Sequence, residues 1–168
     1  MTTLILTVAG SDRPGLVAAV ADVVDSHGGN WENSQLAELA GVFAGVIQVS
    51  VTPEHQDELA SALRALDGLL TVAVHAGSDA APAAVQPISL QILGNDRPGI
   101  VREVSTVLRV HEVSIQDMTT ETKDAAMAGG RLFEASVTAE VPASADLDAL
   151  RADLERLTSE LQVDITLT

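Results

Sequence analysis

The octapeptide GSDRPGLV at residues 10–17 returns as GNDRPGIV at residues 94–101. Asp12 and Asp96 open the shared Asp-Arg-Pro-Gly and lie 84 positions apart, half of the 168-residue chain. Two units of about 80 residues are each long enough to bury a modest core, so the spacing indicates one folding unit written twice.

The apolar positions on both sides of the octapeptide repeat as well. Before it, alternate residues are apolar with the period of two typical of a half-buried strand: Leu4, Leu6 and Val8, then Ile88, Leu90 and Ile92. After it, apolar residues recur on one face of a helix: Leu16, Val17, Val20, Val23 and Val24, then Ile100, Val101, Val104, Val107 and Leu108. The polar positions differ freely, so a fold is duplicated and not only a peptide.

The rest of each half continues in parallel. A second strand over about residues 30–39 and a turn lead to a third strand, whose apolar positions match at an offset of 86: Ile47, Val49 and Val51, then Phe133, Ala135 and Val137. We assign the two extra residues to the turn at 122–130. A second helix follows Pro53, and its longer counterpart follows Pro142, before a last alternating strand. The order β-α-β-β-α-β predicts an α+β fold of two ferredoxin-like domains, each with both helices on one face of an antiparallel sheet.

A linker is expected between the halves, because GSDAAPAAVQP at 77–87 is rich in Ala, Gly and Pro. We predict a first domain at 1–77, a linker at 78–86 and a second domain at 87–168. The free face and the edges of each sheet need covering, and the second copy is the nearest cover.

Composition restricts the partners. The chain is 46% hydrophobic and 20% charged, which is globular, and its net charge of −15 with only 9 scattered basic residues would repel a phosphate backbone. Cysteine is absent, and no apolar run reaches the roughly 18 to 20 residues that span a bilayer. With no basic leader at the start, we expect a soluble, cytoplasmic protein that binds neither nucleic acid nor membrane.

The repeated loop suggests an anion site. A strand that runs through a tight loop into a helix directs free backbone N–H groups and the positive end of the helix dipole at one point. The carboxylates of Asp12 and Asp96 stand beside these donors and can accept from an ammonium group, so a free amino acid matches the loop. The alternative is that the loops are only helix caps, with no ligand.

In either case we place Pro14 and Pro98 in the first helical turn and a capping oxygen on Ser11 or Asp12, or on Asn95 or Asp96. Gly15 and Gly99 would also lie in that turn, where a missing Cβ serves close approach by a ligand or a neighbouring strand.

Some residues near the end of each first helix could bind a ligand, and others are expected to have only a structural role. Asn30 begins the second strand, where its amide can meet a ligand or simply form a turn, and its counterpart Ser114 is shorter. Gly28 or Gly29 of HGGN is expected to end the first helix in a left-handed conformation, whereas HEVS must end its counterpart without glycine. His27 and His111 would stabilise these helix ends through the dipole, and Trp31 would pack the sheet.

Signatures of catalysis are missing. Leu16 and Val17 stand where a P-loop needs Lys and Ser or Thr, and the chain has neither a Gly-x-Ser-x-Gly elbow nor a His-Glu-x-x-His helix. The four histidines are dispersed. We therefore predict no catalytic residue, no metal and no cofactor. A small enzyme of the acylphosphatase type stays open as a remote alternative.

Two longer stretches resemble a known family. LTVAGSDRPGLVAAVADVVDSHGGNWENSQ and LQILGNDRPGIVREVSTVLRVHEVSIQDM are each similar to the opening half of an ACT domain, the amino-acid-sensing module of many biosynthetic enzymes. The resemblance implies that the antiparallel sheets of the two domains pack side by side. It also implies ligand sites at a domain or subunit interface, lined by Ser11, Asp12, Arg13, Gly15, Leu16 and Asn30. The matching residues of the second half are Asn95, Asp96, Arg97, Gly99, Ile100 and Ser114, with Ser114 departing from the amide of the pattern.

Two ACT domains with no enzyme attached resemble the family's regulators of glycine cleavage genes. This implies a non-enzymatic sensor of glycine or a similar amino acid that acts through a transcription factor and not on DNA. An amino-acid-sensing accessory subunit of a metabolic enzyme is the alternative. We also expect a homo-oligomer, because the edges of such sheets pair within or between chains.

Overall fold

The structure, a computed structural model, describes residues 1–78, 83–125 and 129–168. Most of the expected linker, residues 79–82, and the centre of the expected turn at 122–130 therefore lie outside the described residues. The chain divides into two compact units, Met1–Ala80 and Ala81–Thr168, each of which is described by itself.

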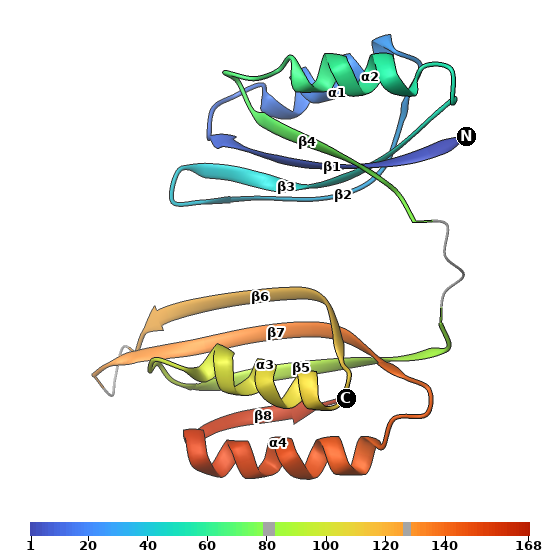
Figure 1. Cartoon of the computed structure of the whole chain (residues 1–168). Coiled ribbons are helices and arrows are strands. Elements are labelled where there is room, and N and C mark those ends of the chain that lie inside the picture. Colours follow the sequence, from blue (N-terminus) through green and yellow to red (C-terminus); the bar gives the residue numbers. More distant parts are fainter. Residues whose placement is uncertain (79–82, 126–128) are drawn as a thin grey trace. The chain divides into compact units, whose positions relative to one another are not determined.

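Both units have the predicted order of elements. The first unit comprises β1 (Thr2–Ser11), α1 (Leu16–Ser26), β2 (Asn30–Leu39), β3 (Val42–Val51), α2 (Gln56–Arg64) and β4 (Thr71–Ala76). The second comprises β5 (Val85–Asn95), α3 (Ile100–Val110), β6 (Ser114–Asp124), β7 (Arg131–Pro142), α4 (Leu147–Leu161) and β8 (Val163–Leu167). Each unit has a four-stranded antiparallel sheet, in the order β2-β3-β1-β4 or β6-β7-β5-β8, with both helices on one face (Figure 1). The predicted α+β, ferredoxin-like class is confirmed.

The alternating apolar residues form the two cores, between sheet and helices. Leu6 and Val49 are completely buried in the first unit, as are Leu90 and Val141 in the second. The helices contribute apolar residues four apart, which lie on one stripe: Leu16, Val20 and Val24, then Ile100, Val104 and Leu108. Val17 and Val101 lie off this stripe and are 45% and 42% exposed, so only part of the predicted helix face is buried.

The starts of α1 and α3 differ from the prediction. Gly15 and Gly99 are the N-cap residues and not helical ones, with φ of +92° and +100°. Neither helix has a side-chain cap, so the expected capping oxygens of Ser11 or Asp12, and of Asn95 or Asp96, are wrong. The helices begin two residues later than expected because glycine turns the chain, which leaves Pro14 and Pro98 outside the first turn.

The ends of α1 and α3 follow the prediction. Gly28 takes the left-handed conformation after α1, with φ of +69°. After α3 the same position is held by Glu112 at φ of +56°, and the N–H of Val113 donates to the carbonyl of Leu108 at 2.9 Å, as Gly29 does to Val24. Helix α3 therefore ends without glycine, and its glutamate takes a left-handed conformation that is unfavourable for an L-residue.

The second sheet starts inside the segment expected to be linker. Val85 and Gln86 already pair with Pro142 and Val141, because the twelve-residue β7 offers partners that far. The domain boundaries at 77 and 87 stay a prediction.

Candidate functional site

The first loop leaves the sheet at Ser11, the last residue of β1, which pairs with Val42. The backbone N–H of Asp12 donates to the carbonyl of Gly41 at 2.8 Å, which fixes the loop against the β2–β3 hairpin. The carboxylate of Asp12 is exposed and has no partner among the described residues. It is thus available, as predicted, to a group from outside the unit.

Gly15 shapes the entry into α1. A Cβ on Gly15 would have no heavy atom within 4 Å, so glycine is needed there for its positive φ and not, as expected, for close approach by a strand of its own unit. The first bond of the helix runs from the N–H of Ala19 to the carbonyl of Gly15 at 3.0 Å. The N–H groups of the first turn therefore have no helical acceptor, and no acidic side chain lies in that turn.

Leu16 and Ile100 belong to the cores. They are 3% and 2% exposed, so only their backbone could meet a ligand. The remaining predicted residues of the two loops are exposed to solvent, except Gly99, which is partly buried.

A recess opens beside the first loop. Its volume is about 380 Å³, and its lining joins the end of β1, Arg13 and the turn between α2 and β4: Ala9, Gly10, Ser11, Arg13, Asp67, Gly68, Leu69, Leu70 and Thr71. The guanidinium of Arg13 donates to the carbonyl of Gly68 at 3.1 Å. We call this cavity the Arg13 recess. It brings together two of the predicted residues, Ser11 and Arg13.

The sequence argument missed Asp67 and Gly68. They lie in LDGLL, residues 66–70, where the Asp-Gly pair signals a turn between the second helix and the last strand. That signal was present, but no repeat of it exists in the second half to draw attention to it.

The second loop has the same backbone and different surroundings. Asn95 pairs with Leu132, and the N–H of Asp96 donates to the carbonyl of Arg131 at 2.8 Å. Arg97 has no hydrogen-bond partner among the described residues. Glu103 lies in the first turn of α3 and pairs with Arg102 at 2.7 Å.

Asn30 and Ser114 lie at the far end of each sheet from the loops. The register places Asn30 opposite Ser50, which pairs with Thr3, eight rows of β1 away from Ser11. At about 3.3 Å per residue, the separation along the sheet is roughly 26 Å. One unit therefore does not unite the loop and Asn30 in a single site, and only another copy of the domain can bring such ends together.

The helix-end histidines have structural contacts. The Nδ1 of His27 lies 2.8 Å from the carbonyl oxygen of Val23, in the last turn of α1. The Nε2 of His111 lies 2.8 Å from a carboxylate oxygen of Asp153 and links α3 to α4. This hydrogen bond is the main reason that the pKa of Asp153 is lowered, with Arg156 nearby adding to it. Trp31 packs against the first core, as predicted.

The two units match known domain families. Residues 2–76 match one family model of the ACT domain, and residues 83–164 match another. The chain belongs to the ACT-domain family. Its two ACT domains stand in tandem, as the resemblance of the sequence implied.

Known relatives align with this tandem ACT protein over most of its length. The glycine cleavage system transcriptional repressor of Escherichia coli strain K12 is 27% identical over 162 residues, 94% of this chain and 85% of the repressor. The crystal structure of an "unknown protein" from Galdieria sulphuraria is 30% identical, with a TM-score of 0.89 over 99% of this chain and 96% of that one. The crystal structure of a candidate glycine cleavage system transcriptional repressor, 20% identical, shares the fold with a TM-score of 0.70, over 99% of this chain and 96% of that one.

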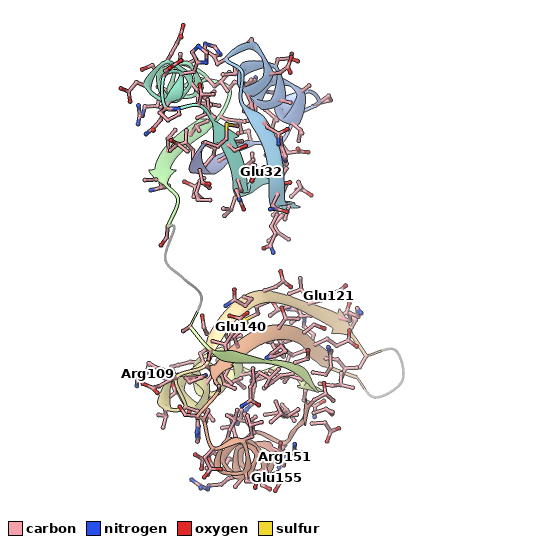
Figure 2. All side chains as sticks on the ribbon, turned by 90° about the vertical axis from the view of Figure 1, so that its right-hand side faces the viewer. Glu32, Arg109, Glu121, Glu140, Arg151 and Glu155 are labelled. Atoms are coloured by element: carbon pink, nitrogen blue, oxygen red, sulfur yellow. The ribbon has the colours of Figure 1, made fainter. Side chains whose placement is uncertain are left out.

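Charged side chains lie on both ACT domains, with Glu32 on β2 of the first (Figure 2). Arg109 lies on α3 and Arg151 on α4, with Glu155 one turn further along α4, while Glu121 and Glu140 lie on strands of the second sheet (Figure 2). Within the described ranges, no group of three or more His, Asp or Glu side chains is placed to hold a metal ion. Over the same ranges, no helix is long and apolar enough to cross a membrane.

Proposed function

We propose that this tandem ACT protein is a non-enzymatic regulator that senses a small amino acid, glycine or a similar one, and modulates a transcription regulator of the glycine cleavage type. One observation carries the proposal. ACT domains occupy 2–76 and 83–164, and 94% of the chain aligns with a glycine cleavage system transcriptional repressor.

The proposed ligand contacts are the twelve residues implied by the family pattern. In the first domain, the loop offers free N–H groups at the start of α1, an unpaired carboxylate on Asp12 and the guanidinium of Arg13. These groups are complementary to the carboxylate and the ammonium of an amino acid. Asn30 and Ser114 would join a site only from another domain or another chain, which agrees with a ligand bound at an interface.

Sensing requires a difference in affinity. A ligand that binds one arrangement of the domains better than another shifts the population toward it, by no more than that difference in free energy. The arrangement favoured by the amino acid would then bind the partner protein more tightly or more weakly.

The partner is proposed to be a protein. With a net charge of −15 and basic side chains on separate elements, the chain would be repelled by DNA. A second copy of the chain is also proposed, because the sheet face opposite the helices carries Val42 and Val46, which are 53% and 46% exposed. Light scattering of the purified chain tests the oligomer, and a monomer at all concentrations contradicts it.

Titration calorimetry of the full chain with each of the twenty amino acids tests the proposed sensing. We expect saturable heat with glycine or another small amino acid, and no heat with any of them contradicts the proposal. Affinity purification with and without the amino acid that binds then separates the partner classes. Ligand-dependent recovery of a DNA-binding regulator supports the proposal, whereas recovery of a metabolic enzyme selects the alternative, an accessory subunit that senses amino acids.

A further inference from the structure

We propose that the chain binds one amino acid and not two, and that the ligand occupies the Arg13 recess of the first domain. This inference rests on the proposed sensing function and adds the location and the number of sites. Four observations carry it: the recess, the chemistry of its lining, the missing turn in the second domain and the charge at the helix start.

The lining of the recess matches a zwitterion. Arg13 uses one donor on the carbonyl of Gly68, and a guanidinium has five N–H donors, so enough remain for a ligand carboxylate. Asp67 lines the same recess and forms no ion pair with Arg13, so its carboxylate is available to an ammonium group. A ligand with both charges satisfies Arg13 and Asp67 together and adds no net charge to an acidic protein.

The recess exists because the chain does not pass directly from α2 into β4. After Arg64, residues 65–69 form a turn in which Gly68 has φ of +94° and the N–H of Leu70 donates to the carbonyl of Leu66 at 3.0 Å. The buried Leu70 forms the floor. Gly10 forms part of the wall, and a Cβ there would lie 3.0 Å from the carbonyl oxygen of Leu69. The turn thus stands next to the loop and leaves space between them.

The second domain lacks the turn that lines the Arg13 recess in the first domain. Only Gln162 separates α4 from β8, so the turn that lines the recess has no counterpart. Gly94, which corresponds to Gly10, pairs with Val163, and a Cβ on Gly94 would lie 2.5 Å from a methyl carbon of that valine. Val163 lies beside Gly94 as Leu70 lies beside Gly10, so the difference between the domains is the turn at residues 65–69, which the second domain does not have.

The charge at the start of the first helix of each domain also favours ligand binding in the first domain. The first turn of α1 carries no acidic side chain, whereas the first turn of α3 carries Glu103. A carboxylate at a helix N-terminus already interacts favourably with the helix dipole, and it repels a second carboxylate. The loop of the second domain is therefore the poorer site for an amino acid.

Calorimetry of the full chain with glycine and L-serine, followed by the other amino acids, tests the inference through stoichiometry and matched variants. We expect one bound amino acid per chain. Arg13→Gln removes the charged partner of the carboxylate and should weaken binding at least about tenfold. Arg109→Gln is the control: it removes an exposed charge from α3, outside both repeated loops, and should leave the affinity within about a factor of two, because exposed charges are screened. Asp67→Asn should weaken binding as Arg13→Gln does.

The outcomes separate the two proposals. Two bound amino acids per chain, or equal weakening by Arg13→Gln and Arg109→Gln, overturns the single site in the Arg13 recess and leaves the sensing function in place. The absence of binding by every amino acid overturns the sensing function and this inference with it. Circular dichroism of each variant checks that a loss of binding does not come from unfolding, and we expect folded variants because Arg13, Asp67 and Arg109 are exposed.

Discussion

Replacing Gly15 with alanine isolates the energy of the loop conformation. At φ of +92° an L-residue is strained, and the added Cβ would meet no heavy atom within 4 Å. The substitution therefore adds strain without a clash and removes no contact. Left-handed backbone costs an L-residue roughly 1–2 kcal/mol, so we expect Gly15→Ala to lower the free energy of unfolding of the first domain by about that amount.

Trp31 provides an assay for the first domain alone. It is the only tryptophan of the chain, and it packs against the core of that domain. In urea, a domain of this size has a slope of about 1 kcal/mol per M, so the midpoint of the Trp31 fluorescence transition should fall by about 1–2 M. Gly99→Ala is the matched control, because it places the same strain at φ of +100° in the second domain. It should leave the Trp31 midpoint unchanged and lower the transition of the second domain.

A third variant distinguishes strain from other causes. Asparagine tolerates left-handed backbone better than alanine, so Gly15→Asn should recover part of the lost stability. An unchanged midpoint in Gly15→Ala would refute the left-handed cap. Equal destabilisation by alanine and asparagine would refute backbone strain as the cause.

The remaining predictions concern the second domain. Glu112→Gly should raise its free energy of unfolding by about 0.5–1 kcal/mol in thermal melts, because Glu112 occupies φ of +56°, and a neutral result would contradict strain there. Gly94→Ala should lower it by about 1–3 kcal/mol in urea followed by circular dichroism, because the new Cβ overlaps Val163, and a cost below about 0.5 kcal/mol would show that β8 moves freely. The carboxyl of Asp153 has its pKa lowered from 3.8 by His111, so its contribution is complete above that pH and is lost as pH falls through the lower folded value. The stability advantage of the natural chain over Asp153→Asn should therefore shrink on acidification from about pH 6 to about pH 3 in urea titrations, and an advantage that grows instead would contradict the hydrogen bond as its source.

The helix termini show where local sequence rules succeed and fail. The left-handed end of α1 at Gly28 was predictable, since a glycine just after the last apolar residue of a helix has few other roles. The start of α1 was not, because SDRPG offers several residues able to cap a helix. The choice among them was decided by where the chain turns, at Gly15, and by the bond from Asp12 to Gly41 of a distant hairpin.

Part of the candidate site could be predicted from the sequence, and part could not. The loop residues from Ser11 to Leu16 were found from the repeat, and they lie together because they are consecutive. Asp67 and Gly68 were missed because their role depends on proximity to Arg13, 55 positions before Gly68. The position of Asn30 at the far end of the sheet follows from the register of β1, β2 and β3, which the resemblance did not give.

The sequence by itself determined the duplication, the order of the elements and the identity of the two cores, because burial on one face imposes a period of two on strands and about four on helices. Only the tertiary structure decided that the two repeated loops differ. The length of the connection between the second helix and the last strand sets whether a recess forms beside the loop, and that is a contact between segments far apart in the chain. Nearly identical octapeptides therefore have unlike surroundings: Arg13 and Asp67 line one recess in the first domain, whereas a single residue, Gln162, joins α4 to β8 in the second.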